Sequence, residues 1–134
     1  GARLNWAEHM LRRGRDGDAA LICVQEGGHP AHEITFAELR EQVAAMAGWL
    51  RGAGVRPGDP VAAYLPNTEH AVIGVLATAA VGATWACLFT DFGPDGTIDR
   101  LAQLEPTVLI AIDGYHWNGK VHDRADVVAQ LREG

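Results

Sequence analysis

The stretch that decides the fold runs from Gly54 to Asn67 and reads GVRPGDPVAAYLPN. Gly54 can adopt the left-handed conformation that ends a helix, and residues 56–59 combine Pro, Gly and Asp in a typical turn. Residues 61–65 are an apolar run without alternation, which is typical of a strand covered by helices on both faces. A proline ends that run, and Asn67 is a preferred N-cap for the next helix. The stretch therefore predicts a helix, a turn, a strand and a second helix.

The same alternation continues on both sides of this stretch. Residues 19–24 and 33–35 are predicted to form an N-terminal β-hairpin, and a capping box at Thr35 and Glu38 begins an amphipathic helix. After residue 35 the predicted order is α β α β α β α, which is typical of a mostly parallel sheet flanked by helices. The predicted helices are 3–14, 36–53, 68–81, 94–105 and 124–134, the later strands are 61–65, 84–89 and 108–112, and a turn is predicted at 113–120.

The composition limits the classes of function. The 134 residues, 48% hydrophobic and 21% charged, suit a single α/β unit with a real core. The 11 Lys and Arg against 17 Asp and Glu give a net charge of −6, which argues against a general nucleic-acid or anionic-membrane surface. The sequence shows neither the roughly 20 apolar residues of a membrane span nor a secretion signal. We therefore expect a cytoplasmic protein without nucleic-acid or membrane partners.

Cysteine and histidine spacing predicts no metal site. Cys23 and Cys87 lie far apart, without a CxxC or Cys/His pattern, so both are interpreted as reduced core thiols. The chain also lacks GxxxxGK[ST], GxGxxG, GxSxG and HExxH motifs. No catalytic residue is therefore predicted in this chain.

Three loops lie at the carboxyl ends of predicted strands, at residues 66–68, 89–93 and 113–120, where open parallel sheets bind ligands. The residues of the last two make them candidate ligand sites. In FTDFG, residues 89–93, Phe89 and Phe92 could offer a face to an adenine ring, or they could simply fill the core. In GYHWNGK, residues 114–120, aromatic side chains stand near Lys120, a combination that suits a phosphorylated nucleotide. A solvent-exposed hairpin tip is the alternative for the GYHWNGK loop.

Three long segments resemble, in order and spacing, the amino-terminal part of the adenylate-forming acyl-CoA synthetases. Within that superfamily, the opening LNWAE, the DFG at 91–93 and the DGYxxxGK at 113–120 are most similar to the acetoacetate-CoA ligases. The three segments are GARLNWAEHML from residue 1, EITFAELREQVAAMAGWLRGAGVRPGDPVAAYLPN from residue 33 and GVLATAAVGATWACLFTDFGPDGTIDRLAQLEPTVLIAIDGYHWNGK from residue 74.

The resemblance implies a ligase that joins ATP and a short-chain carboxylate into an acyl-adenylate, releasing pyrophosphate, and then passes the acyl group to CoA, releasing AMP. Residues 1–134 would be a partial N-terminal subdomain of its large domain. The family's phosphate-gripping loop and catalytic lysine lie beyond the matched region, so this chain alone is expected to be inactive. ATP with Mg²⁺ and CoA would be substrates of the whole enzyme, with no cofactor held tightly here. The expected partner is the rest of the synthetase or a second copy of the chain.

The resemblance also assigns both loops to CoA. In related acetyl-CoA synthetases, positions matching Phe89, Thr90 and Asp91 lie by the CoA nucleotide, and those matching His116 and Lys120 are basic residues near its phosphates. This sequence departs from that pattern, because Thr90-Asp91 replaces a Gly-Gly pair and His116 replaces an Arg. A carboxylate beside phosphates is unfavourable unless it faces away, and His is only partly charged at neutral pH. The alternative function is a binding or assembly module that has lost catalysis.

Overall fold

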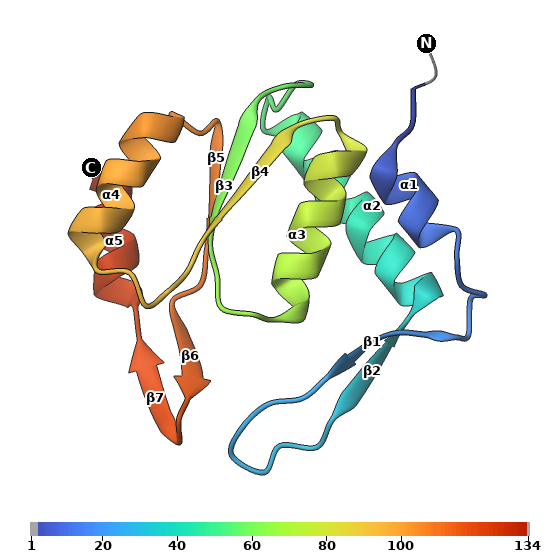
Figure 1. The fold of residues 1–134 in the computed structure, drawn as a ribbon, viewed down its shortest axis with the longest axis horizontal. Helices are drawn as coiled ribbons and strands as arrows, with labels where there is room; N and C mark the ends of the chain where they lie inside the picture. The colour runs from blue at the N-terminus through green and yellow to red at the C-terminus, as the bar shows by residue number, and fades with distance from the viewer. Residues whose placement is uncertain (1–2, 134) are drawn as a thin grey trace.

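The computed structural model describes residues 3–133, except the side chain of Trp117. Helices and strands alternate along most of this range (Figure 1), and the predicted end of the last helix at Gly134 lies outside it. The helices are α1 (Trp6–Leu11), α2 (Phe36–Gly52), α3 (Glu69–Ala80), α4 (Pro94–Leu104) and α5 (Ala125–Glu133). The strands are β1 (Ala19–Cys23), β2 (His32–Thr35), β3 (Pro60–Tyr64), β4 (Thr84–Leu88), β5 (Val108–Ala111), β6 (Gly114–Trp117) and β7 (Lys120–Asp123).

A three-stranded parallel sheet in the order β4-β3-β5 lies at the centre of the molecule (Figure 1). The central strand β3 is buried on both faces. Val61 packs into an apolar cluster with α1, α2 and α3, whereas Ala62 and Tyr64 pack into a second cluster with residues of α4 and α5. Two covered faces explain why residues 61–65 are apolar without alternation, so the predicted parallel sheet flanked by helices is confirmed.

Helices cover the two faces unequally. In Figure 1, α1, α2 and α3 lie on one side of the sheet, and α4 and α5 lie on the other. Every residue of α3 except His70 is buried or half-buried, which confirms the prediction that neighbouring layers surround this apolar helix. Within residues 3–133, the helices are all too short or too polar to cross a membrane.

The connection from α2 to β3 follows the predicted turn chemistry. Gly54 has φ 92° and Gly58 has φ 90°, values that favour glycine. The Asp59 side chain accepts a 2.8 Å hydrogen bond from the Arg56 amide and closes the turn.

The predicted N-cap of α3 is wrong. The helix begins one residue later than an Asn67 cap requires, so the capping position falls to Thr68, whose hydroxyl makes no capping bond. The Thr68 amide instead donates to the Pro66 carbonyl at 2.9 Å, and this local turn delays the helix start.

Two antiparallel hairpins extend from the same end of the molecule (Figure 1). The β1–β2 hairpin confirms the N-terminal prediction. The β6–β7 hairpin occupies most of the segment predicted as a turn, so that prediction is wrong. Its tip is formed by Asn118 and Gly119, with φ 52° and 71°. An Asn-Gly pair with positive φ at both residues is the strongest short hairpin signal, and it was present in the sequence.

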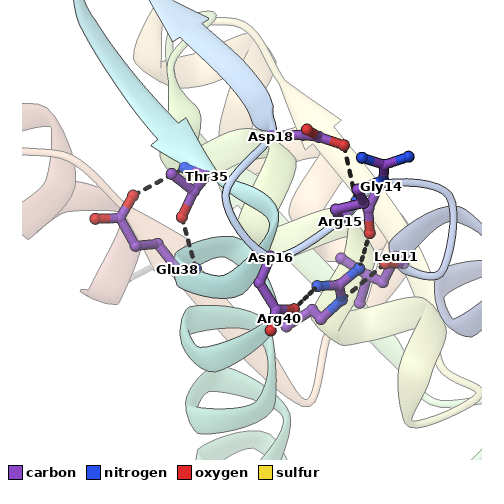
Figure 2. Close-up of polar contacts among 8 residues, drawn as sticks. All are labelled: Leu11, Gly14, Arg15, Asp16, Asp18, Thr35, Glu38 and Arg40. Atoms are coloured by element: carbon purple, nitrogen blue, oxygen red, sulfur yellow. Dashed lines mark hydrogen bonds and ion pairs between the residues drawn. The ribbon is translucent and has the colours of Figure 1, made fainter.

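One arginine anchors the segment between α1 and β1 onto α2 (Figure 2). Arg40 donates from Nε to the Leu11 carbonyl at 2.9 Å and from Nη1 to Asp16 Oδ1 at 2.8 Å, and its Nη2 donates to the Gly14 carbonyl. Its guanidinium carbon also lies 5.5 Å from the centre of the Phe36 ring. The planar guanidinium of Arg40 therefore donates hydrogen bonds to the Leu11 carbonyl at the end of α1, the Gly14 carbonyl and Asp16 at once.

The start of α2 is capped as predicted (Figure 2). Thr35 Oγ1 accepts a 3.2 Å hydrogen bond from the Glu38 amide, and Glu38 Oε2 accepts a 2.8 Å bond from the Thr35 amide. This reciprocal pair satisfies two amides that the helix itself leaves unpaired, which confirms the predicted capping box.

Candidate functional site

A cleft of about 740 Å³ lies where the three parallel strands end. The loops that follow β3, β4 and β5 form its floor and sides, as expected for an open parallel sheet. The segment after β1 and the β6–β7 hairpin complete the walls. The lining residues are 24–26, 66–70, 89–91, 112, 114–116, His122 and Arg124.

Contacts between the two hairpins close one side of this cleft. The Gly119 amide at the tip of the β6–β7 hairpin donates a 3.1 Å hydrogen bond to Glu26 Oε2. The rings of His29 and His116 meet edge to face, with centroids 5.9 Å apart. Residues about ninety positions apart in the chain therefore form one wall.

The structure brings four of the five residues assigned to CoA into this cleft. Phe89, Thr90, Asp91 and His116 line it, whereas Lys120 lies outside the lining, exposed at the start of β7. Phe89 is 59% exposed, so the alternative that it fills the core is wrong.

Phe92 does not share the cleft with Phe89. It is 43% exposed and lies under Arg100, whose guanidinium carbon is 5.5 Å from the ring centre. The suggestion that Phe92 fills the core is therefore also wrong. Of the two phenyl rings, only Phe89 is placed to contact a ligand in the cleft.

A network of buried and half-buried polar side chains lies beneath the loop at residues 89–93. The hydroxyl of Tyr64 at the end of β3 donates a 3.2 Å hydrogen bond to the Thr90 carbonyl. Arg124 Nη2 donates a 3.2 Å bond to the Tyr115 hydroxyl, and its guanidinium carbon lies 5.7 Å from the centre of that ring. The Tyr115 ring stacks on His122 with centroids 5.1 Å apart. The network joins the ends of three strands.

The two tyrosines of this network have pKa values shifted in opposite directions. Burial raises the pKa of Tyr64, and this effect exceeds the opposing charge of Arg124. Burial also acts to raise the pKa of Tyr115, but hydrogen bonds with Thr90 and Arg124 and the Arg124 charge outweigh it, so the pKa of Tyr115 is lowered. The difference arises because Tyr115 is stabilised as a phenolate by hydrogen bonds with Thr90 and Arg124, whereas Tyr64 gains only the Arg124 charge against its burial.

We expect the two tyrosines to ionise in separate steps. They are the only tyrosines in the chain, so a spectrophotometric titration of phenolate absorbance counts them directly. Tyr115 should lose its proton below the ordinary pKa of about 10, and Tyr64 above it. Tyr115→Phe should remove the first step, and Arg124→Gln should move it toward higher pH. A single unresolved step that involves both residues would contradict this assignment.

Two polar atoms in the cleft lack partners among the described residues. Thr68 Oγ1 and Arg124 Nε are both buried, and neither makes a hydrogen bond within residues 3–133. A buried unpaired polar atom costs about 1–3 kcal/mol, so each favours a ligand or water that supplies the missing partner. Arg124 in particular offers an unused N–H to an anion.

The charge of the lining restricts where an anion can lie. Three carboxylates, those of Glu26, Glu69 and Asp91, face one guanidinium, that of Arg124. The remaining titratable groups of the lining are the histidines and Tyr115. With neutral histidines, one positive and three negative charges give the lining a formal net charge of −2. A phosphate is therefore favoured near Arg124 and disfavoured near the carboxylates.

Residues 8–133 match the family model described as AMP-binding enzyme. The chain belongs to this family. The match covers the strands, the cleft and the network beneath it, and leaves out only the start of α1 and the residues at the two ends. The architecture described above is thus that of an AMP-binding enzyme over nearly all of its length.

Several relatives within the AMP-binding enzymes are acetoacetyl-CoA synthetases. The protein from Macaca fascicularis is 40% identical over 134 residues, which are 100% of this chain and 20% of that protein. The protein from Rhizobium meliloti (strain 1021) is 40% identical over 131 residues, covering 98% of this chain and 19% of that protein. A solved structure of the acetoacetyl-CoA synthetase from Streptomyces lividans has a TM-score of 0.95 and 52% identity, covering 99% of this chain and 21% of that one.

These similarities confirm the resemblance and the expected fold. The chain spans about a fifth of the length of the relatives it matches. They do not favour the alternative of a non-catalytic binding or assembly module.

Thr68 and Tyr115 lie in two of the three loops predicted at strand ends, and the structure places both in the cleft. Arg124 was not predicted as part of the cleft. The Asn-Gly signal at 118–119 was the clue that could have found it, because a hairpin there directs the chain back to the sheet.

Proposed function

We propose that this chain is the N-terminal part of an AMP-forming acetoacetate-CoA ligase. The similarity to acetoacetyl-CoA synthetases along the full chain carries the proposal. The whole enzyme converts acetoacetate, ATP with Mg²⁺ and CoA into acetoacetyl-CoA, AMP and pyrophosphate. Residues 1–134 are one α/β subdomain of its large domain, and the enzyme works in the cytoplasm. The chain alone is inactive, and its only lysine, Lys120, lies outside the cleft.

The cleft contributes part of the CoA site. The exposed ring of Phe89 is suited to stacking on the adenine. The unpaired Nε–H of Arg124 is suited to a phosphate, because a charged donor to an anion makes a stronger hydrogen bond than a neutral one. His116 and Lys120 are exposed on the adjacent hairpin and meet the outer phosphates. Thr90 is buried and shapes the loop through its carbonyl, and a CoA phosphate near Arg124 requires the Asp91 carboxylate to point away from it.

The reaction is tested in the complete ligase that contains these residues. Pyrophosphate release should require acetoacetate, ATP and Mg²⁺, and acetoacetyl-CoA should form only when CoA is added. Pyrophosphate release with acetate and with butyrate is compared with that for acetoacetate to measure the acid specificity. Absence of acid-dependent pyrophosphate release with all three acids would refute the proposed reaction, whereas a strong preference for acetate would refute only the choice of acid.

Arg124→Gln is expected to raise the KM for CoA about tenfold, which corresponds to about 1.4 kcal/mol of lost binding. The KM values for ATP and acetoacetate should stay unchanged, because neither substrate is assigned to this cleft. Arg132→Gln on α5 is the matched control, since it removes the same charge at a position outside the cleft.

A second control separates the effect of the Arg124 charge from the effect of its hydrogen bond to Tyr115. Tyr115→Phe removes the hydrogen bond to Arg124 but keeps the guanidinium, so the KM for CoA should change less than about threefold. Equal increases in the KM values for CoA and ATP in Arg124→Gln would indicate general damage and would count against the CoA assignment.

A further inference from the structure

Three side chains with metal-binding atoms meet beside the β1–β2 hairpin. Cys23 is the last residue of β1, His32 is the first residue of β2, and Glu69 is the first residue of α3. Their sulfur, nitrogen and oxygen atoms all lie within 4.8 Å of one another. The His32 Nε2 and Glu69 Oε1 atoms are 3.6 Å apart.

The backbone holds this cluster in place. Cys23 and His32 are directly opposite in the antiparallel ladder, so their side chains project from the same face of the hairpin. Cys23 packs against the core cluster that also contains residues of α2 and α3, and Glu69 is fixed at the first turn of α3. His32 is exposed and leaves the cluster open to solvent on one side.

We propose that Cys23, His32 and Glu69 bind one Zn²⁺ ion, with a water molecule as the fourth ligand. A thiolate, an imidazole and a carboxylate form a donor set that suits Zn²⁺ and other borderline transition metals. Mg²⁺ and Ca²⁺ prefer sites made of oxygen atoms alone, so this donor set disfavours them. The proposal does not rest on the proposed ligase activity, although Glu69 also lines the cleft, and the site is distinct from that of the Mg²⁺ that accompanies ATP.

The distances support a tetrahedral site. With bonds of roughly 2.0–2.3 Å, tetrahedral ligand atoms lie roughly 3.3–3.8 Å apart. The separation between His32 and Glu69 already falls in this range, and the widest separation in the cluster needs to close by only about 1 Å. Small side-chain rotations of the three residues can supply that movement without shifting the hairpin.

The spacing in the sequence explains why no metal site was predicted. His32 follows Cys23 by 9 residues, and Glu69 follows His32 by 37, so no short ligand motif exists. The hairpin register and the packing of both the hairpin and α3 against α2 create the cluster. A bound ion would tie the β1–β2 hairpin to the start of α3, at the edge of the cleft that Glu69 also lines.

Co²⁺ titration of the full 134-residue chain tests the site, because tetrahedral Co²⁺ with a thiolate ligand gives a charge-transfer band. One equivalent should produce this band together with d–d bands, and Zn²⁺ should displace it. Cys23→Ser should abolish the charge-transfer band, and Glu69→Gln and His32→Ala should each weaken Co²⁺ binding at least about tenfold. Zn²⁺ should also raise the melting temperature of the unaltered chain but not of Cys23→Ser.

Cys87→Ser is the matched control, since Cys87 is the other half-buried thiol and lies on β4, away from the cluster. Its Co²⁺ spectrum should equal that of the unaltered chain, and far-UV circular dichroism should show the same fold for every variant. A thiolate band that survives Cys23→Ser, a band that disappears in Cys87→Ser, or no thiolate band at all would overturn the proposal. Loss of ligase activity with an intact Co²⁺ spectrum would instead bear on the proposed function alone.

Discussion

Tyr64→Ala is expected to lower the free energy of unfolding by about 3–5 kcal/mol, because it empties the largest fully buried side-chain position in the described residues. Tyr64 is 0% exposed and packs with Leu88, Leu101 and Leu131 between the sheet and the helices α4 and α5. Alanine leaves a cavity at a place where the central strand of the sheet prevents collapse. It also frees the Thr90 carbonyl from its hydrogen bond.

Urea unfolding followed by circular dichroism measures this loss in the 134-residue chain. Tyr64→Phe is the control, because it keeps the ring and removes only the hydroxyl, so it should cost about 0.5–1.5 kcal/mol. If the alanine and phenylalanine variants lost the same stability, the loss would come from the hydroxyl and not from packing around the ring. A loss below about 1 kcal/mol in Tyr64→Ala would contradict the role of this side chain in the core.

Arg40→Ala is expected to cost about 2–3 kcal/mol, the second largest loss. Three hydrogen bonds from one guanidinium end at the Leu11 and Gly14 carbonyls and at Asp16. Hydrogen bonds to charged groups contribute about 1.5–3 kcal/mol each, but the Arg40 side chain is 31% exposed, so solvent reduces their sum. Their loss leaves two loop carbonyls without their protein donor and releases the segment that joins α1 to β1.

Proteolysis and urea unfolding together test this anchor. Arg40→Ala should show new cleavage between α1 and β1 under native conditions, in addition to the lower unfolding free energy. Arg40→Lys should recover less than half of the loss, because an ammonium cannot reproduce the planar fork. Arg51→Ala, at an exposed position on the same helix, should change stability by no more than about 0.5 kcal/mol. If Arg40→Ala and Arg51→Ala lowered the unfolding free energy equally, the loss would come from the charge on the helix and not from the hydrogen bonds of Arg40.

Local chemistry made most of the fold predictable. The capping box of Thr35 and Glu38, the positive φ of Gly54 and the apolar run of β3 depend on residues that are close in sequence, and all three predictions were confirmed. One error, the missed β6–β7 hairpin, comes from an overlooked Asn-Gly signal, and the other lies where two local preferences compete. Asn67 is a good N-cap by type, but the turn at Pro66 places the helix start one residue further on.

The candidate site was only partly predictable. The loops at 89–93 and 113–120, with His116 in the second, were found because strand ends in a parallel sheet are common ligand sites, and their assignment to CoA came from the resemblance to a family. Arg124 was missed, and Thr68 was not singled out within its loop, because their importance lies in unpaired buried atoms, a property that depends on what surrounds them. Whether these residues bind CoA stays a prediction that the KM measurements test.

The sequence by itself determined the order of helices and strands as far as β5, the parallel sheet and the family, because these depend on periodicity, turn residues and motifs along the chain. Only the tertiary structure decided which side chains meet. The Tyr64, Tyr115 and Arg124 network and the cluster of Cys23, His32 and Glu69 join residues from separate strands and helices. Their contacts arise from strand register and layer packing, and these long-range pairings leave no short pattern in the chain.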